Sequence, residues 1–248
     1  MKTSLFRSLW RLHLITPRGI VRLLNCFLHE GITMMAAVRF AARYHTHDCA
    51  VVSDNQHIDY QDFYAIARRL SHLLYHKYHL KSGQHVALFC RNHLVSALLL
   101  PALSRLGVHV RLLNTDLSSE QLAKLMSRPF ALFIYDEEFI QADGLDDMCP
   151  MVSCEALLES IKRQDTIEKI ALPHIKRGGN ISVMTGGSSG NYKEAARQTG
   201  IVQFLPPFFS LLRDLHIDSY QSVLIGLPFY HGFGLATLII SLVMGKKV

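Results

Sequence analysis

The first half of the chain alternates between helical and strand-like hydrophobic patterns. Apolar residues recur at helical spacing over 60–79, 93–106 and 118–127. Short apolar runs of the kind that form buried strands lie between them, at 85–90, 108–113 and 130–135. Because strand–helix–strand alternation with short turns is typical of βαβ units, we expect an α/β fold with a parallel sheet.

Two of these helices carry recognisable start signals. Asp59 precedes the helix at 60–79 and is a candidate N-cap, since its carboxylate can accept a hydrogen bond from the first free amides. The helix at 118–127 opens with Ser-Ser-Glu-Gln, which predicts a capping box between Ser118 and Gln121.

The second half has a weaker pattern. The interval 136–179 is more polar, and we predict that it separates two sheets. A strand at 181–184 would begin the second sheet, followed by a helix over 200–215 interrupted by Pro206 and Pro207 and a strand at 222–226. The predicted organisation is a helical segment (1–48), a first α/β subdomain (49–179) and the incomplete start of a second (180–248).

A glycine- and hydroxyl-rich loop at 185–193 is the main candidate for chemistry. Glycines let backbone amides approach an anion, hydroxyls donate hydrogen bonds and a lysine adds a positive charge, so the loop suits a polyphosphate. It is not a Walker loop, because two residues separate Gly190 from Lys193, and no Gly-x-Gly-x-x-Gly occurs in the chain. An ordinary surface turn is the alternative. The candidate phosphate-binding residues are Thr185, Gly186, Gly187, Ser188, Ser189, Gly190 and Lys193.

The loop resembles the signature of the AMP-forming adenylating enzymes, which include acyl-CoA synthetases, luciferases and the adenylation domains of peptide synthetases. The usual form is Thr-Ser-Gly-Thr-Thr-Gly-x-Pro-Lys-Gly. Tyr192 and Glu194 stand where the family has proline and glycine, and the carboxylate of Glu194 would oppose a triphosphate. A downstream segment, Leu-Pro-Phe-Tyr-His-Gly-Phe-Gly-Leu at 227–235, resembles the family's PLFHxxG element.

Upstream segments extend the resemblance over nearly the whole chain. The strand and turn at 86–92, with its arginine–asparagine pair, and Leu-Leu-Asn-Thr at 112–115 resemble the family's first βαβ unit. The segments at 41–45 and 50–52 resemble bacterial fatty-acyl-CoA synthetases. The fold implied is an adenylating-enzyme N-terminal domain with two doubly wound βαβ layers, the second of them incomplete.

The resemblance implies an acid–thiol ligase that adenylates a carboxylic acid of the fatty-acid class with ATP and Mg²⁺ and passes the acyl group to coenzyme A. The loop would hold the β- and γ-phosphates. His231 would act beside the acyl-adenylate as a catalytic residue, and the acyl pocket would include Phe229, His231, Gly232 and Phe233. The alternatives are a histidine bonded to a backbone carbonyl and phenylalanines that belong to the core.

Members of that family are about twice as long, well beyond one ordinary domain. Their Gly-Tyr-Gly-x-Thr-Glu loop, ribose-binding aspartate and C-terminal lysine have no counterpart here. We therefore expect an N-terminal portion that is inactive without the missing half. A non-catalytic binding or scaffolding remnant and an amino-acid adenylation domain are the alternatives.

The charge of the chain favours anionic partners such as nucleotides, coenzyme A or a membrane surface. The 248 residues carry a net charge of +6, and part of it lies in the first thirty residues. Leu5, Leu9 and Leu12 recur there at helical spacing, so this stretch either docks on the protein or lies on a membrane. No dense basic block or zinc-finger spacing indicates nucleic acid.

The cysteines and histidines bear on the redox compartment and on metal binding. Five cysteines without a Cys-x-x-Cys pair indicate a reducing compartment, so we expect a cytoplasmic protein with peripheral membrane contact as the alternative. His72 and His76 lie four residues apart, and His45 and His47 two apart, but no third ligand follows nearby. The sequence therefore predicts no metal site.

Overall fold

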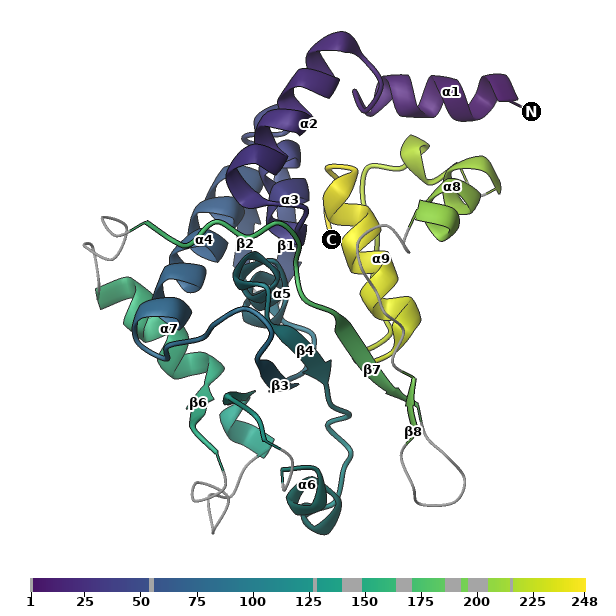
Figure 1. Ribbon diagram of the computed structural model, residues 1–248. Coiled ribbons are helices and arrows are strands. Elements are labelled where there is room, and N and C mark those ends of the chain that lie inside the picture. The colour runs from purple at the N-terminus through teal and green to yellow at the C-terminus, as the bar shows by residue number, and fades with distance from the viewer. Residues whose placement is uncertain are drawn as a thin grey trace.

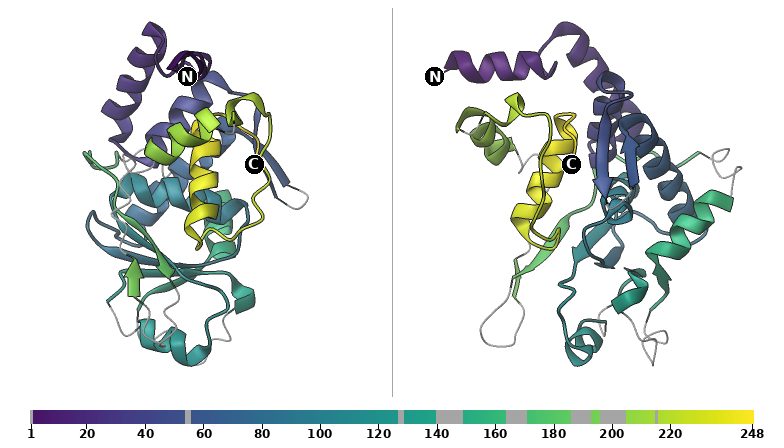
Figure 2. Two further views of the ribbon diagram at one scale, coloured as in Figure 1. Left: turned by 90° about the vertical axis from the view of Figure 1, so that its right-hand side faces the viewer. Right: turned by 180° about the vertical axis from the view of Figure 1, so that it is seen from behind.

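A computed structural model describes residues 2–53, 56–126, 129–139, 149–163, 171–185, 193–195, 205–214 and 216–248 of the chain. These residues form one large and one small sheet, with helices on both sides of the large sheet (Figures 1 and 2). The strands are β1 (Cys49–Ser53), β2 (Gln56–Asp59), β3 (His85–Phe89), β4 (His109–Leu112), β5 (Leu132–Tyr135), β6 (Met151–Ser153), β7 (Ile181–Thr185) and β8 (Lys193–Ala195).

The large sheet has the strand order β6-β5-β3-β4-β7-β8. All pairs from β6 to β7 are parallel, and β8 runs antiparallel to β7. The predicted α/β class is thus confirmed. One expectation was wrong in detail: β7 does not begin a separate sheet, because Ile181 and Val183 pair with Val110 and Leu112 of β4.

The helices follow the predicted pattern closely in the first half. Their bounds are α1 (Lys2–Arg11), α2 (Pro17–Glu30), α3 (Met34–Tyr44), α4 (Tyr60–His76), α5 (Leu94–Leu106), α6 (Ser119–Met126), α7 (Cys154–Arg163), α8 (Leu205–Asp214) and α9 (Gly232–Val243). Both start signals are confirmed. Asp59 accepts a hydrogen bond of 2.8 Å from the amide of Asp62. Ser118 and Gln121 bond each other's amides at 3.3 and 3.0 Å.

Alternate residues of the strands face two different layers. On β3, Val86 and Leu88 join the main core, which also takes in apolar residues of α3, α4, α5, α7 and α9. The intervening Ala87 and Phe89 face a smaller cluster built on α6. Every residue of α5 from Val95 onward is buried, so this helix lies at the centre of the main layer, between the sheet and α4.

Two expectations for the last fifty residues need correction, and one helix there was not predicted. The proline pair does not interrupt a helix, because α8 begins at Leu205 and holds both prolines in its first turn, where their missing N–H groups have no intrahelical partner. Residues 222–226 form no strand beyond a single bridge from Ser222 to Lys247. The apolar run after His231 forms α9, which the sequence pattern did not predict as a helix.

The N-terminal helix α1 docks on the protein. Leu9 and Leu12 pack against a cluster that contains Leu212 of α8 and Ile240 of α9. Arg11 adds an ion pair of 3.1 Å with the buried Asp218. Two of the three leucines of the predicted stripe, Leu9 and Leu12, thus contact the protein itself. Within the described residues, no helix combines the length and apolar character needed to cross a bilayer.

A buried carboxylate ties α2 to three other helices. Glu30, at the end of α2, accepts hydrogen bonds from Arg105 of α5 at 2.8 Å, from Arg39 of α3 at 3.3 Å and from the Tyr64 hydroxyl of α4 at 2.6 Å. The side chains of Glu30 and Arg105 are only 5 and 7% exposed. Each charge therefore depends on the other for compensation.

We predict that Glu30→Ala lowers the free energy of unfolding by about 3–5 kcal/mol, because it leaves the Arg105 guanidinium buried without its partner. Urea denaturation measures the change. Glu159→Ala is the matched control: it removes the exposed pair with Arg163, and its expected cost is below about 1 kcal/mol. A Glu30→Ala cost as small as that of the control would show that the network does not hold α2 in place.

Candidate functional site

Two segments singled out in the sequence, the arginine–asparagine turn after β3 and the segment 227–231, are joined by one side chain. The amide nitrogen of Asn92 donates a hydrogen bond of 2.8 Å to the carbonyl of Leu227. Its amide oxygen accepts one of 2.8 Å from the backbone N–H of Phe229. Both polar groups of Asn92 are thus used to fasten a segment 135 residues away.

The candidate phosphate loop lies between β7 and β8. Thr185 and Lys193 pair across the antiparallel strands, so the two ends of the loop face each other. Gly186, Gly187, Ser188, Ser189 and Gly190 lie outside the described residues. Because β7 is parallel to β3, β4 and β5, its carboxyl end meets theirs at one edge of the sheet. The loop therefore starts at the edge where β3 also ends and the Asn92 turn begins.

The start of α9 lies against β7. His231 is the N-cap of α9, and within the described residues its side chain makes no capping hydrogen bond. A Cβ on Gly232 would lie 3.9 Å from Cγ2 of Val183, an ordinary van der Waals distance, so the start of α9 is within contact distance of β7. The first turn of α9 has no acidic residue. Its free amides and the positive end of the helix dipole favour an anion.

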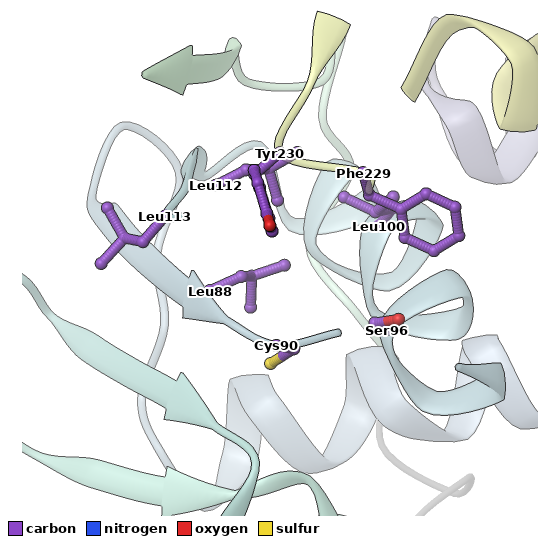
Figure 3. Close-up of a pocket in the computed structure, with 8 residues that line it drawn as sticks. All are labelled: Leu88, Cys90, Ser96, Leu100, Leu112, Leu113, Phe229 and Tyr230. Carbon is purple, nitrogen blue, oxygen red and sulfur yellow. The ribbon is translucent and has the colours of Figure 1, made fainter. Parts of the chain in front are cut away.

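The aromatic residues proposed for an acyl pocket have different surroundings. Phe229 is 7% exposed and belongs to the main core. With Tyr230 it covers a cavity of about 10 Å³, enough for one water molecule. Figure 3 shows the cavity between these rings and the side chains Leu88, Cys90, Ser96, Leu100, Leu112 and Leu113. Phe233 is 65% exposed, so it does not share this cavity with Phe229. His231 and Gly232 are also exposed.

A buried aspartate and a partly buried histidine form a pair beside the Asn92 turn. Nε2 of His93 is 2.8 Å from Oδ1 of Asp136, and the Arg91 amide donates a hydrogen bond of 2.8 Å to Oδ2. Burial acts to raise the pKa of Asp136, but these hydrogen bonds outweigh it and hold the pKa below its usual value. The sequence did not reveal the pair; its only signal was an acidic residue directly after a predicted strand.

The ring of His93 is held from both sides. Burial acts to lower its pKa, while hydrogen bonds to Asp136 and Cys154 raise it to about 10. Nδ1, however, accepts hydrogen bonds from the amides of Val95 and Ser96 at 3.1 and 3.3 Å at the start of α5. A proton on Nδ1 would break both. Capping therefore opposes the rise and favours a neutral ring with its proton on Nε2.

We predict that Asn92→Ala lowers the free energy of unfolding by about 1–2 kcal/mol, the net value of two hydrogen bonds. It also frees the segment 227–231, so hydrogen–deuterium exchange of the Phe229 amide should accelerate. Asn92→Asp keeps the acceptor for Phe229 and loses the donor to Leu227, so its exchange should be intermediate. Unchanged exchange at Phe229 in the alanine variant would show that Asn92 does not hold the segment.

Comparisons with known proteins extend this picture. The model of the family described as "AMP-binding enzyme" matches residues 38–248. Among solved structures, o-succinylbenzoate CoA synthetase (MenE) from Bacillus subtilis with its acyl-adenylate intermediate OSB-AMP superposes with a TM-score of 0.70 at 20% identity, over 86% of this chain and 54% of MenE. The same enzyme with ATP and magnesium gives 0.69 at 21% identity, over 86% and 56%.

The inhibitor-bound N-terminal domain of FACL13 from Mycobacterium tuberculosis gives a TM-score of 0.72 at 19% identity, over 87% of this chain and 57% of that domain. At these identities the superpositions show the shared fold. This chain spans about half the length of the structures it matches. No curated protein sequence matches the chain significantly. Because the family model covers residues 38–248, this chain belongs to the AMP-binding enzyme family.

Proposed function

We propose that the chain is the N-terminal portion of an ATP-dependent acyl-CoA synthetase that acts on a carboxylic acid of the fatty-acid class. The observation that carries the proposal is the convergence at one sheet edge. Asn92 fastens the segment 227–231, and Gly232 at the start of α9 lies within van der Waals reach of Val183 on β7, the strand that leads into the phosphate loop. Family membership and the MenE complexes with ATP and acyl-adenylate support it.

The proposed reaction has two steps. A carboxylate oxygen of the acid attacks the α-phosphorus of ATP, and pyrophosphate leaves as the acyl-adenylate forms. The thiolate of coenzyme A then attacks the acyl carbonyl, and AMP leaves. Negative charge develops on the leaving pyrophosphate in the first step, so donors aimed at the β- and γ-phosphates stabilise its transition state.

This chain's contribution to the first step would come from the loop ends and the start of α9. The pairing of Thr185 with Lys193 holds the two ends of the loop side by side. The backbone amides in the first turn of α9 can bind an anion. Lys193 would add a positive charge, and the loop hydroxyls would donate to phosphate oxygens. Mg²⁺ bound with ATP would neutralise part of the phosphate charge. Glu194, which pairs with Met184, works against this balance.

The acyl group would lie on the exposed side of the segment 227–233. The cavity beside Phe229 holds only about one water molecule, so we assign Phe229 to the wall of the core rather than to direct contact with an acyl chain. His231, Gly232 and Phe233 face outward near β7, where a carboxylate next to ATP would arrive. His231 would then contact the acyl-adenylate.

We predict that MgATP shifts and broadens its β- and γ-phosphate resonances in ³¹P NMR when this chain is added, and that Lys193→Ala weakens the binding about tenfold or more, as expected for a lost charge-assisted contact. Lys162→Ala, an exposed lysine on α7, is the control and should leave binding unchanged. The chain alone should release no pyrophosphate in the presence of a fatty acid.

The other outcomes separate the alternatives. If the chain does not bind MgATP, or if Lys193→Ala binds it as well as the wild type, the result would favour a remnant that kept the fold and lost the phosphate site. Tyr192 and Glu194, which depart from the family signature, would then reflect that loss. Fatty-acid-dependent pyrophosphate release by the chain alone would contradict the expected inactivity. Pyrophosphate exchange that depends on an amino acid, once the missing half is supplied, would favour an amino-acid adenylation domain.

We also propose that α2 contacts anionic membrane surfaces. This helix precedes the family-model match, which begins at residue 38. In Figure 1, α1 and α2 lie at one end of the molecule, beyond the large sheet. One side of α2 exposes a row of apolar side chains: Ile20, Val21, Leu24 and Leu28. Arg18 is exposed one turn before Val21, whereas Arg22 lies over the Tyr44 ring of α3, 4.6 Å from its centre. An exposed apolar row with an arginine at its side suits a negatively charged lipid surface.

This contact predicts co-flotation of the chain with phosphatidylglycerol vesicles and weak flotation with phosphatidylcholine vesicles. Leu24→Glu combined with Leu28→Glu should abolish the flotation, because two charges then enter the apolar row. Leu224→Glu is the control, since Leu224 is 96% exposed elsewhere on the surface. Equal flotation of all variants would contradict a role for α2.

A further inference from the structure

Three buried side chains with metal-binding atoms meet at the carboxyl edge of the large sheet. Cys90 directly follows β3, Asp136 directly follows β5 and Cys154 directly follows β6. Because β6, β5 and β3 are parallel neighbours, the residues after them gather at one edge. All three residues are less than 9% exposed. They lie on the far side of the Asn92 turn from the proposed phosphate loop, in a part of the sheet that the proposed reaction does not use.

The distances within this cluster suit a small cation. The two sulfur atoms are 3.4 Å apart. One ligand atom from each of the three residues lies within 4.8 Å of the other two. Since zinc–sulfur bonds are about 2.3 Å and zinc–oxygen bonds about 2.0–2.2 Å, two ligands of a tetrahedral zinc ion lie about 3.4–3.8 Å apart. Movements of the ligand atoms by about 1 Å would bring their separations to those of a tetrahedral zinc site.

A disulfide fits the same cysteines less well. Strand β5 lies between β3 and β6, and neighbouring strands are about 4.8 Å apart, so two strand spacings separate the backbones by roughly 10 Å. A disulfide usually joins Cα atoms about 4.4–6.8 Å apart. The two sulfur atoms approach each other to 3.4 Å near the end of β5, where Asp136 provides a third ligand. A bound ion can span this arrangement without moving the strands.

The surroundings of Asp136 prepare its carboxylate for such a role. His93 and the Arg91 amide each bond one of its oxygens at 2.8 Å, which fixes the plane of the carboxylate. Each oxygen keeps a second lone pair for an ion. His93 itself cannot ligate through Nε2 while Nδ1 accepts the amides of Val95 and Ser96, so it orients Asp136 in the way that outer partners orient metal ligands.

We propose that Cys90, Cys154 and Asp136 bind one zinc ion. Two thiolates select zinc over magnesium or calcium, which prefer oxygen ligands. Binding releases the two thiol protons and leaves a fourth position for a water molecule. The ion joins the ends of β3, β5 and β6, and Cys90 is only two residues from Asn92. Zinc would therefore stabilise the turn that holds the segment 227–231. The zinc proposal itself does not rest on the proposed ATP reaction.

The test is the metal content and cobalt spectrum of the purified chain. After exposure to zinc and dialysis, mass spectrometry should find about one zinc per chain in the wild type. Replacement by Co²⁺ should give the intense thiolate-to-cobalt charge-transfer absorption in the near ultraviolet. Cys154→Ser and Asp136→Asn should lose most of the zinc, and Cys154→Ser should lose most of the absorption. Cys26→Ser removes a thiol of 0% exposure in a different core cluster and should keep both signals.

A measurement on the wild type alone guards against variants that fail to fold. Zinc should raise its melting temperature, and a chelator should reverse the rise. The proposal is overturned if the folded wild type retains no zinc after dialysis and gives no thiolate-to-cobalt absorption. It is equally overturned if Cys154→Ser holds as much zinc as Cys26→Ser. These results do not depend on ATP binding, so they are independent of the proposed function.

Discussion

The parallel pairing of β4 with β7 is the interaction on which the candidate site depends. It joins strands about seventy residues apart, through pairs such as Val110 with Ile181. Because the two strands run in the same direction, β7 delivers the 185–193 loop to the sheet edge where β3 ends and the Asn92 turn begins. An antiparallel or separate β7 would carry the loop away from that turn. The proposed chemistry therefore rests on a backbone register more than on any single side chain.

The carboxyl edge of the sheet brings several polar side chains together. Asn92, Asp136 and the two cysteines follow directly, or nearly so, on apolar strands. A strand end is where the chain leaves the sheet, so its side chains meet those at the ends of the neighbouring parallel strands. One half of this edge, near β4 and β7, carries the proposed phosphate site. The other half, from β3 to β6, carries the thiol–carboxylate cluster.

The sequence predicted the fold where local signals were strong. Helices α4, α5 and α6 matched their apolar spacing, and the caps at Asp59 and Ser118 formed as expected. It failed where tertiary contacts decide. The placement of β7 beside β4 is a long-range pairing, β6 has only three residues, and α9 is apolar on nearly all sides and so lacks a helical stripe.

The candidate site was likewise predicted only in part from the sequence. The resemblance selected the segments at 86–92 and 227–235, and the structure joins them through Asn92, whose role no spacing could reveal. The loop glycines and serines lie outside the described residues, and the roles of Lys193 and His231 stay predictions. The cysteine cluster escaped notice because Cys90 and Cys154 are 64 residues apart and match no metal-binding spacing.

Hydrogen–deuterium exchange with and without MgATP, resolved to single amides, tests the central claim most directly. If the sheet edge built by β4 and β7 is a phosphate site, MgATP slows exchange at amides of the 185–193 loop and of the first turn of α9, and leaves α2 and α7 unchanged. Protection confined to another part of the chain, or none at MgATP concentrations that saturate related enzymes, would contradict the account.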